Sequence, residues 1–117
     1  MSQTARFQEI LRRLAIFDEG FTEAGPVYGA AEPSTLDPKI TALLQVAVSV
    51  AIGSSAVCLQ WSAARALASG ASKDEIAEVL LAIAPVAGLG RVVSAAPKVA
   101  TALGYDVEAA LEDTDDH

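Results

Sequence analysis

The chain has 117 residues, enough for one domain with its own core. It is 52% hydrophobic but only 5% aromatic, so small side chains supply much of an apolar surface that one small domain cannot bury alone, and we expect a homo-oligomer. The formal net charge is −7 and no basic patch with interleaved aromatic residues exists, which argues against nucleic-acid binding.

The first predicted helix covers residues 4–18. Its polar side carries Glu9, which is placed to pair with Arg12 or Arg13. Its other side is an apolar stripe that would pack on the core or on a neighbouring subunit. The stripe consists of Phe7, Ile10, Leu11, Leu14 and Phe17. This N-terminal segment lacks the uncharged apolar core of a secretory signal, so we expect a cytoplasmic protein.

Residues 20–35 are predicted to form an irregular connector because glycine and proline break them repeatedly, with a short helical turn over residues 21–24 as an alternative. The second helix begins at Pro38 with Asp37 as its N-cap, and Gly53 ends it. Since this helix is apolar nearly all round, we expect it at the centre of a bundle.

The third helix is predicted to start at Ser54 or Ser55 and to end before Gly70. Residues 40–64 contain no charge and are long enough to span a bilayer. Polar residues and the break at Gly53 interrupt them, however, so we expect two buried helices joined by a turn and no membrane association.

The fourth helix opens at Ser72, which has capping-box spacing to Glu75, and Pro85 ends or kinks it. Its predicted buried face consists of Ile76, Val79, Leu80 and Ile83. Residues 87–104 are predicted to be helical, with a break near Pro97.

Residues 105–117 carry six acids and no Lys or Arg, which predicts a solvated, frayed end or, as an alternative, a charged interaction tail. No βαβ alternation occurs, so the fold class is all-α: a compact bundle of five to six helices in one domain, 1–117. Within it, residues 1–35 form an N-terminal helix and connector, residues 36–104 the core and residues 105–117 the acidic tail.

The sequence contains no Gly-rich nucleotide-binding loop. One cysteine and one histidine exclude an intrachain disulfide and a four-ligand zinc site within one chain. The histidine, His117, lies at the end of the acidic tail and is not expected to take part in catalysis. We therefore expect neither a cofactor nor a metal.

The cysteine, Cys58, lies near the start of the third helix. It shares one stripe of this helix with Ser55, Trp61, Ser62 and Arg65. Free N–H groups at a helix N-terminus favour a reactive thiolate, whereas burial beside Trp61 would favour an inert structural thiol. The pattern leaves both interpretations open.

Several pieces of the sequence occur together in a known order. They are "LDPK" at a helix start, an uncharged helix leading to a glycine, Cys-Leu, Gly-Ala twelve residues later, and "SKDEIAEVLLA". With these pieces in this order, residues 36–104 resemble the core of the carboxymuconolactone decarboxylase family, which includes the alkylhydroperoxidase D-like proteins. The ending "RVVSAAPKVATALGYDVEAAL" is similar to a subgroup of the family mostly without assigned activity.

The resemblance implies an expectation about redox chemistry. Peroxidase members of the family use Cys-x-x-Cys, a His four residues after the second Cys, and a Glu on the preceding helix. Carried over, the second Cys falls on Cys58, the first on Ser55, the His on Ser62 and the Glu near Leu43. A serine is neither a resolving thiol nor an acid or base near neutral pH, so the two-cysteine mechanism does not carry over.

Three functions compete. We expect first an oligomeric small-molecule-binding or accessory protein, a trimer or a hexamer. The alternative is a one-cysteine peroxidase, an antioxidant enzyme with Cys58 as nucleophile. A further alternative is lactone decarboxylation, with Arg91 holding an anionic substrate, although no histidine is available as acid or base. The candidate binding residues are Ser55, Trp61, Ser62, Arg65 and Arg91.

Overall fold

The computed structural model describes residues 5–16 and 35–115. Its contacts divide the chain into two units, residues 1–35 and 36–117, and each is described by itself. The described residues form six helices and no strand, which confirms the predicted all-α class. The predicted turn over residues 21–24, the ends of the first predicted helix and His117 lie outside the described residues.

The first unit contains helix α1 (Arg6–Ala15). On its polar side, the Arg12 guanidinium lies 2.9 Å from a Glu9 carboxylate oxygen, so the predicted pair is confirmed. Such an exposed pair one helical turn apart adds only a few tenths of a kcal/mol, about 0.3–0.5, to helix stability.

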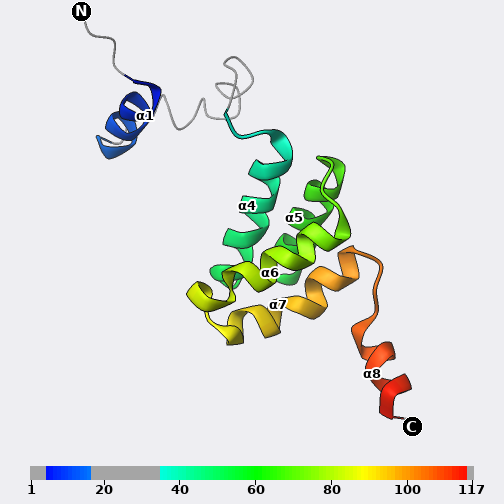
Figure 1. Ribbon diagram of the computed structural model, residues 1–117. Helices are drawn as coiled ribbons and strands as arrows, with labels where there is room; N and C mark the ends of the chain where they lie inside the picture. The colour runs from blue at the N-terminus through cyan, green and yellow to red at the C-terminus, as the bar shows by residue number, and fades with distance from the viewer. Residues whose placement is uncertain (1–4, 17–34, 116–117) are drawn as a thin grey trace, which may run out of the picture. The chain divides into compact units, whose positions relative to one another are not determined.

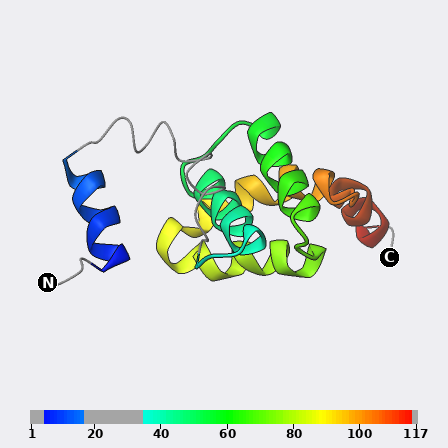
Figure 2. The same ribbon diagram turned by 90° about the horizontal axis from the view of Figure 1, so that it is seen from above.

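The second unit is built around a bundle of four helices, α4 (Pro38–Ala51), α5 (Ala56–Ala68), α6 (Lys73–Ala87) and α7 (Leu89–Ala102) (Figure 1). Helix α4 packs mainly on α5 and α6, and α7 packs mainly on the same two helices. Figure 2 shows this arrangement from above. The largest fully buried side chains are Val46, Val50, Leu59 and Ile76. Alanines fill much of the remaining core, so the helices approach closely.

Local capping fixes where the core begins. The Asp37 carboxylate accepts a hydrogen bond from the Ile40 backbone N–H at 2.9 Å, and Pro38 occupies the first helical position, as predicted. At the other end of α4, the N–H groups of Gly53 and Ser54 bond back to the last turn. Gly53 has φ = +70°, which glycine adopts at no steric cost. This turn starts α5 and positions the candidate site.

The capping box at the start of α6 is confirmed. The Glu75 N–H donates to the Ser72 hydroxyl at 3.0 Å, and the Ser72 N–H donates to the Glu75 carboxylate at 2.8 Å. The ammonium of Lys39 on α4 lies 3.0 Å from the same carboxylate and ties the two helix starts together. The Ser72 backbone hydrogen bond, followed by the Lys39 bond, holds the pKa of Glu75 below its ordinary value.

The lowered pKa of Glu75 predicts a pH dependence. The ionised carboxylate stabilises the fold above the ordinary pKa, near 4.5, and this contribution is lost as the pH falls through the lower pKa of the folded state. We expect the Glu75→Gln variant to show a smaller decline of the free energy of unfolding below that pH than the wild type. Urea titrations across the acidic range measure it. Glu78→Gln removes a carboxylate from the same helix and should leave the decline unchanged; equal flattening in both variants contradicts the assignment.

Two prolines lie inside helices rather than at breaks. Pro85 is in the last turn of α6, which ends at Ala87, and α7 runs through Pro97 to Ala102. The predicted break near Pro97 is therefore wrong. Pro97 is exposed, so water can reach the helix face that loses one internal hydrogen bond, and the Thr101 hydroxyl donates to the Pro97 carbonyl at 3.0 Å.

The predicted frayed tail is also wrong for part of its length. Residues Val107–Asp115 form helix α8, which among the described helices contacts α7. The Asp106 carboxylate caps it by accepting from the Ala109 N–H at 3.1 Å. A capping acid and Glu108 in the first turn complement the positive end of the helix, so part of the acidic run favours helix here.

Helix α4 is not surrounded by the bundle as predicted. Ala42, Val46 and Val50 are buried, but the row Ile40, Leu44, Val48 and Ile52 is between 40 and 68% exposed. The even distribution of apolar residues around α4 does not show which side the other bundle helices cover. Among the described residues, no helix is both long and apolar enough to cross a bilayer, because the uncharged stretch is split between α4 and α5.

Candidate functional site

The start of α5 carries Ser55 and Cys58, the two residues to which the resemblance assigns the family's cysteine pair. Ser55 is the N-cap of the helix, and its hydroxyl accepts a hydrogen bond from the Cys58 backbone N–H at 3.3 Å. The Cys58 side chain is exposed on the single chain, so the packing of this chain alone does not bury it beside Trp61. Ser55 serves the local structure as the helix cap.

One turn further along α5, Ser62 is buried at 7% exposure. Its hydroxyl lies 3.1 Å from the Ser49 hydroxyl of α4, so each serine satisfies the other across the helix interface. No described buried side-chain polar atom lacks a hydrogen-bond partner. Ser62, to which the resemblance assigns the family's histidine, is thus a small hydroxyl with a structural bond.

The outer side of the same turns presents an aromatic and a cation together. The Arg65 guanidinium lies over the Trp61 ring, 5.2 Å from its centroid, within the range of a cation–π contact. Trp61 is 61% exposed. Both residues line one hollow, so an aromatic ring and a cation are offered there together.

This hollow, the α4–α5 groove, has a volume of about 470 Å³, within the range of small-molecule sites. Its apolar lining consists of Leu36, Leu44, Val48 and Trp61. Its polar lining consists of Thr41, Gln45, Ser49, Ser62 and Arg65. Arg65 is the only charged residue among them. A mostly apolar surface with one cation suits an amphipathic molecule that carries a single negative charge.

The structure brings together some predicted site residues and separates others. Trp61, Ser62 and Arg65 line the α4–α5 groove, whereas Ser55 and Cys58 lie outside its lining. Arg91, on α7, lines a different hollow.

By the resemblance the family's glutamate falls near Leu43, which packs against the core and lines a small apolar hollow between α4 and α6. The neighbouring Leu44 lines both this hollow and the α4–α5 groove.

Three residues of the groove were not identified from the sequence as site residues. Thr41, Gln45 and Ser49 recur every four residues on the otherwise apolar helix α4, and this spacing places them on one face. A polar stripe of period four on an apolar helix is the signal that predicts the second wall of the groove.

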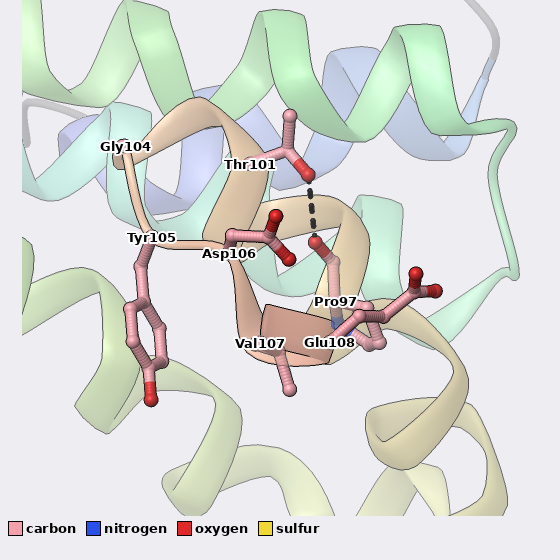
Figure 3. Close-up of a pocket in the computed structure, with 7 residues that line it drawn as sticks. All are labelled: Pro97, Thr101, Gly104, Tyr105, Asp106, Val107 and Glu108. Atoms are coloured by element: carbon pink, nitrogen blue, oxygen red, sulfur yellow. Dashed lines mark hydrogen bonds between the residues drawn. The ribbon is translucent and has the colours of Figure 1, made fainter. Parts of the chain in front are cut away.

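A further hollow lies at the corner between α7 and α8 (Figure 3). The close-up shows the Thr101 hydroxyl directed at the Pro97 carbonyl, with the Asp106 carboxylate beside this bond and the Tyr105 ring pointing away. Since the Asp106 carboxylate caps α8, the polar groups of this hollow serve the turn between α7 and α8. Within residues 5–16 and 35–115, no cluster of His, Cys, Asp or Glu is suited to hold a metal ion.

Comparison with known proteins adds one match. The model of the carboxymuconolactone decarboxylase family matches residues 21–102, more than half of the chain. No curated protein and no solved structure matches the chain significantly.

Proposed function

The chain belongs to the carboxymuconolactone decarboxylase family, and we propose that it binds a small molecule in the α4–α5 groove and does not run the two-cysteine peroxidase cycle. The bond between the Ser49 and Ser62 hydroxyls carries this proposal. It supports a fixed structural role at the position where a peroxidase needs a proton-transferring histidine.

The groove lining supports a class of ligand. Apolar side chains from α4 and Trp61 favour a hydrocarbon or aromatic body, and Arg65 favours a carboxylate or sulfonate at one end. The Arg65 guanidinium lies 5.2 Å from the Trp61 ring centroid, so the groove offers a cation beside an aromatic ring. The ligand proposed is an amphipathic monoanion.

The test uses the sole tryptophan as its reporter. Anilinonaphthalene sulfonate has an aromatic body and one negative charge, and it accepts energy from tryptophan emission. We expect saturable quenching of Trp61 emission on addition of this probe, and octanoate should displace it. Binding without any change in Trp61 emission would place the probe elsewhere and contradict the proposal.

We also propose that the chain acts as a homo-oligomer. Ile52, after α4, and Val57, on α5, are 68% and 76% exposed, and neither lines the α4–α5 groove. Large apolar side chains that are left exposed together are typical of an interaction surface. Sedimentation velocity should show a trimer or a hexamer, and Ile52→Lys, at an exposed position outside the groove lining, should lower the mass without changing the far-UV spectrum. A wild-type monomer would refute the assembly.

The one-cysteine peroxidase is a second candidate, favoured by the exposure of Cys58. The thiolate would attack one peroxide oxygen, forming a sulfenic acid and releasing an alcohol or water. An external thiol would then form a mixed disulfide with loss of water, and a second external thiol would restore Cys58. Under this candidate, one equivalent of peroxide yields a dimedone-trappable sulfenic acid within seconds, and Cys58→Ala abolishes turnover.

Lactone decarboxylation stays a prediction without added support. Arg91, its proposed anion-binding residue, lines a hollow that shares no residue with the α4–α5 groove. A direct assay of the lactone with the wild type and the Arg91→Ala variant tests it: conversion by the wild type that the variant loses would establish this activity.

A further inference from the structure

A second hollow lies where the turn between α4 and α5 meets the start of α7. Its volume is about 490 Å³, and it shares no lining residue with the α4–α5 groove. Polar side chains of Ser54, Arg91, Ser94 and Lys98 line it, together with the backbone of Gly53 and Gly90. We call it the Arg91 cavity.

The Arg91 cavity carries two cations and no acid. Arg91 and Lys98 are seven residues apart on α7, two helical turns, so they lie on one face of the helix, with Ser94 between them. Among the described residues, neither cation forms an ion pair. Two unpaired cations on one hollow, in a chain of net charge −7, create a local positive potential that favours an anionic ligand.

The backbone at the start of α7 adds donors to the same place. The N-cap is Gly88, so no side chain caps the helix, and no acid occurs in its first turn. Gly88 and Gly90 both line the hollow, and a Cβ at Gly90 would meet open space, so no side chain at position 90 covers this turn. The positive end of α7 therefore faces the hollow that Arg91 lines.

The turn after α4 fixes the place of the arginine. The Arg91 guanidinium lies against Gly53, so closely that a Cβ there would collide with it. Gly53 thus serves twice: it closes α4 in a left-handed conformation and leaves room for the guanidinium. The guanidinium therefore lies beside the turn that leads into α5, and Ser54 of this turn lines the same cavity.

We propose that the Arg91 cavity binds the phosphate group of a small phosphorylated molecule. A phosphate carries close to two negative charges, which match Arg91 and Lys98, and the guanidinium can donate to two of its oxygens at once. The Ser54 and Ser94 hydroxyls and the first-turn N–H groups of α7 supply further donors. This site is independent of the α4–α5 groove, so its failure leaves the groove proposal intact.

Amide NMR of the full chain tests this proposal with three probes at equal ionic strength: inorganic phosphate, glycerol 3-phosphate and acetate. We expect saturable shifts of the Gly90 and Arg91 amides with both phosphates and none with acetate. Tighter binding of the ester than of inorganic phosphate identifies an organic phosphate as the ligand; equal binding identifies free phosphate.

Variants separate the site from general charge effects. Arg91→Gln and Lys98→Gln should each raise the Kd for phosphate about tenfold, because each removes a charge-assisted contact. Lys73→Gln removes the same charge at the far end of α6, and Arg65→Gln removes it from the groove; both should leave the Kd unchanged. Equal shifts with acetate, or equal loss in all four variants, would overturn the proposal. Lys98→Gln serves as the decisive variant if Arg91→Gln does not fold.

Discussion

The Arg65→Gln variant is expected to bind anilinonaphthalene sulfonate about tenfold or more weakly than the wild type. Arg65 is the only charged residue lining the α4–α5 groove, so no other lining residue replaces its attraction for the sulfonate. A hydrogen bond to a charged group contributes about 1.5–3 kcal/mol, and about 1.4 kcal/mol corresponds to a tenfold change in Kd.

The measurement is the change in Kd from the quenching of Trp61 emission. Arg91→Gln removes the same charge from the other hollow and serves as the matched control, with an unchanged Kd expected. Since the Arg65→Gln variant also loses the cation–π contact, Arg65→Lys, which keeps a charge over Trp61, should recover part of the affinity. Equal weakening in Arg65→Gln and Arg91→Gln would mean that the probe senses only overall charge.

The second large effect concerns two adjacent residues of α5. We expect Leu59→Ala to lower the free energy of unfolding by about 2–5 kcal/mol, because Leu59 is fully buried and its removal leaves a cavity in a tightly packed core. That is a large share of the roughly 5–15 kcal/mol that stabilise a typical domain. Cys58→Ala should change the same quantity by less than about 0.5 kcal/mol, because Cys58 is exposed.

Urea unfolding of both variants at one protein concentration measures the difference between their free energies of unfolding. This difference depends on which side of α5 faces the core. If Cys58→Ala destabilises the protein as much as Leu59→Ala does, the thiol is buried in the functional assembly. The exposure on which the one-cysteine candidate depends would then be absent.

The parts of the fold that depend on local chemistry could be predicted from the sequence. Asp37 before Pro38, and Ser72 three residues before Glu75, satisfy backbone N–H groups within one turn, so residue type and spacing suffice. The end of the second helix at Gly53 is predictable for the same reason, since glycine readily adopts the left-handed conformation that ends a helix.

The errors arose where distant contacts or solvent decide. The effect of Pro97 depends on whether water reaches its side of α7, and the exposed row on α4 depends on which side the other helices cover. Neither property is contained in local spacing. The acidic tail was interpreted from its net charge, although a single acid at a capping position, Asp106, favours a helix.

The candidate site was half predictable. Helical periodicity groups Trp61, Ser62 and Arg65 on one side of α5, and these three do line the groove. The facing wall needs the pairing of α4 with α5, and the separation of Arg91 from this group needs the packing of α7 on the turn at Gly53. Resemblance to a family predicts which residues of one helix belong to a site, but it does not predict which residues of the other helices pack against them.

Steady-state peroxide consumption with excess dithiothreitol tests the central claim most directly. A member without a working relay should consume peroxide no faster than dithiothreitol alone does. Dithiothreitol can replace the resolving thiol that Ser55 does not supply, but it does not replace the proton-transferring histidine that the resemblance places at Ser62. Sustained consumption of many peroxides per chain, lost in the Cys58→Ala variant, would contradict the account and establish a thiol peroxidase.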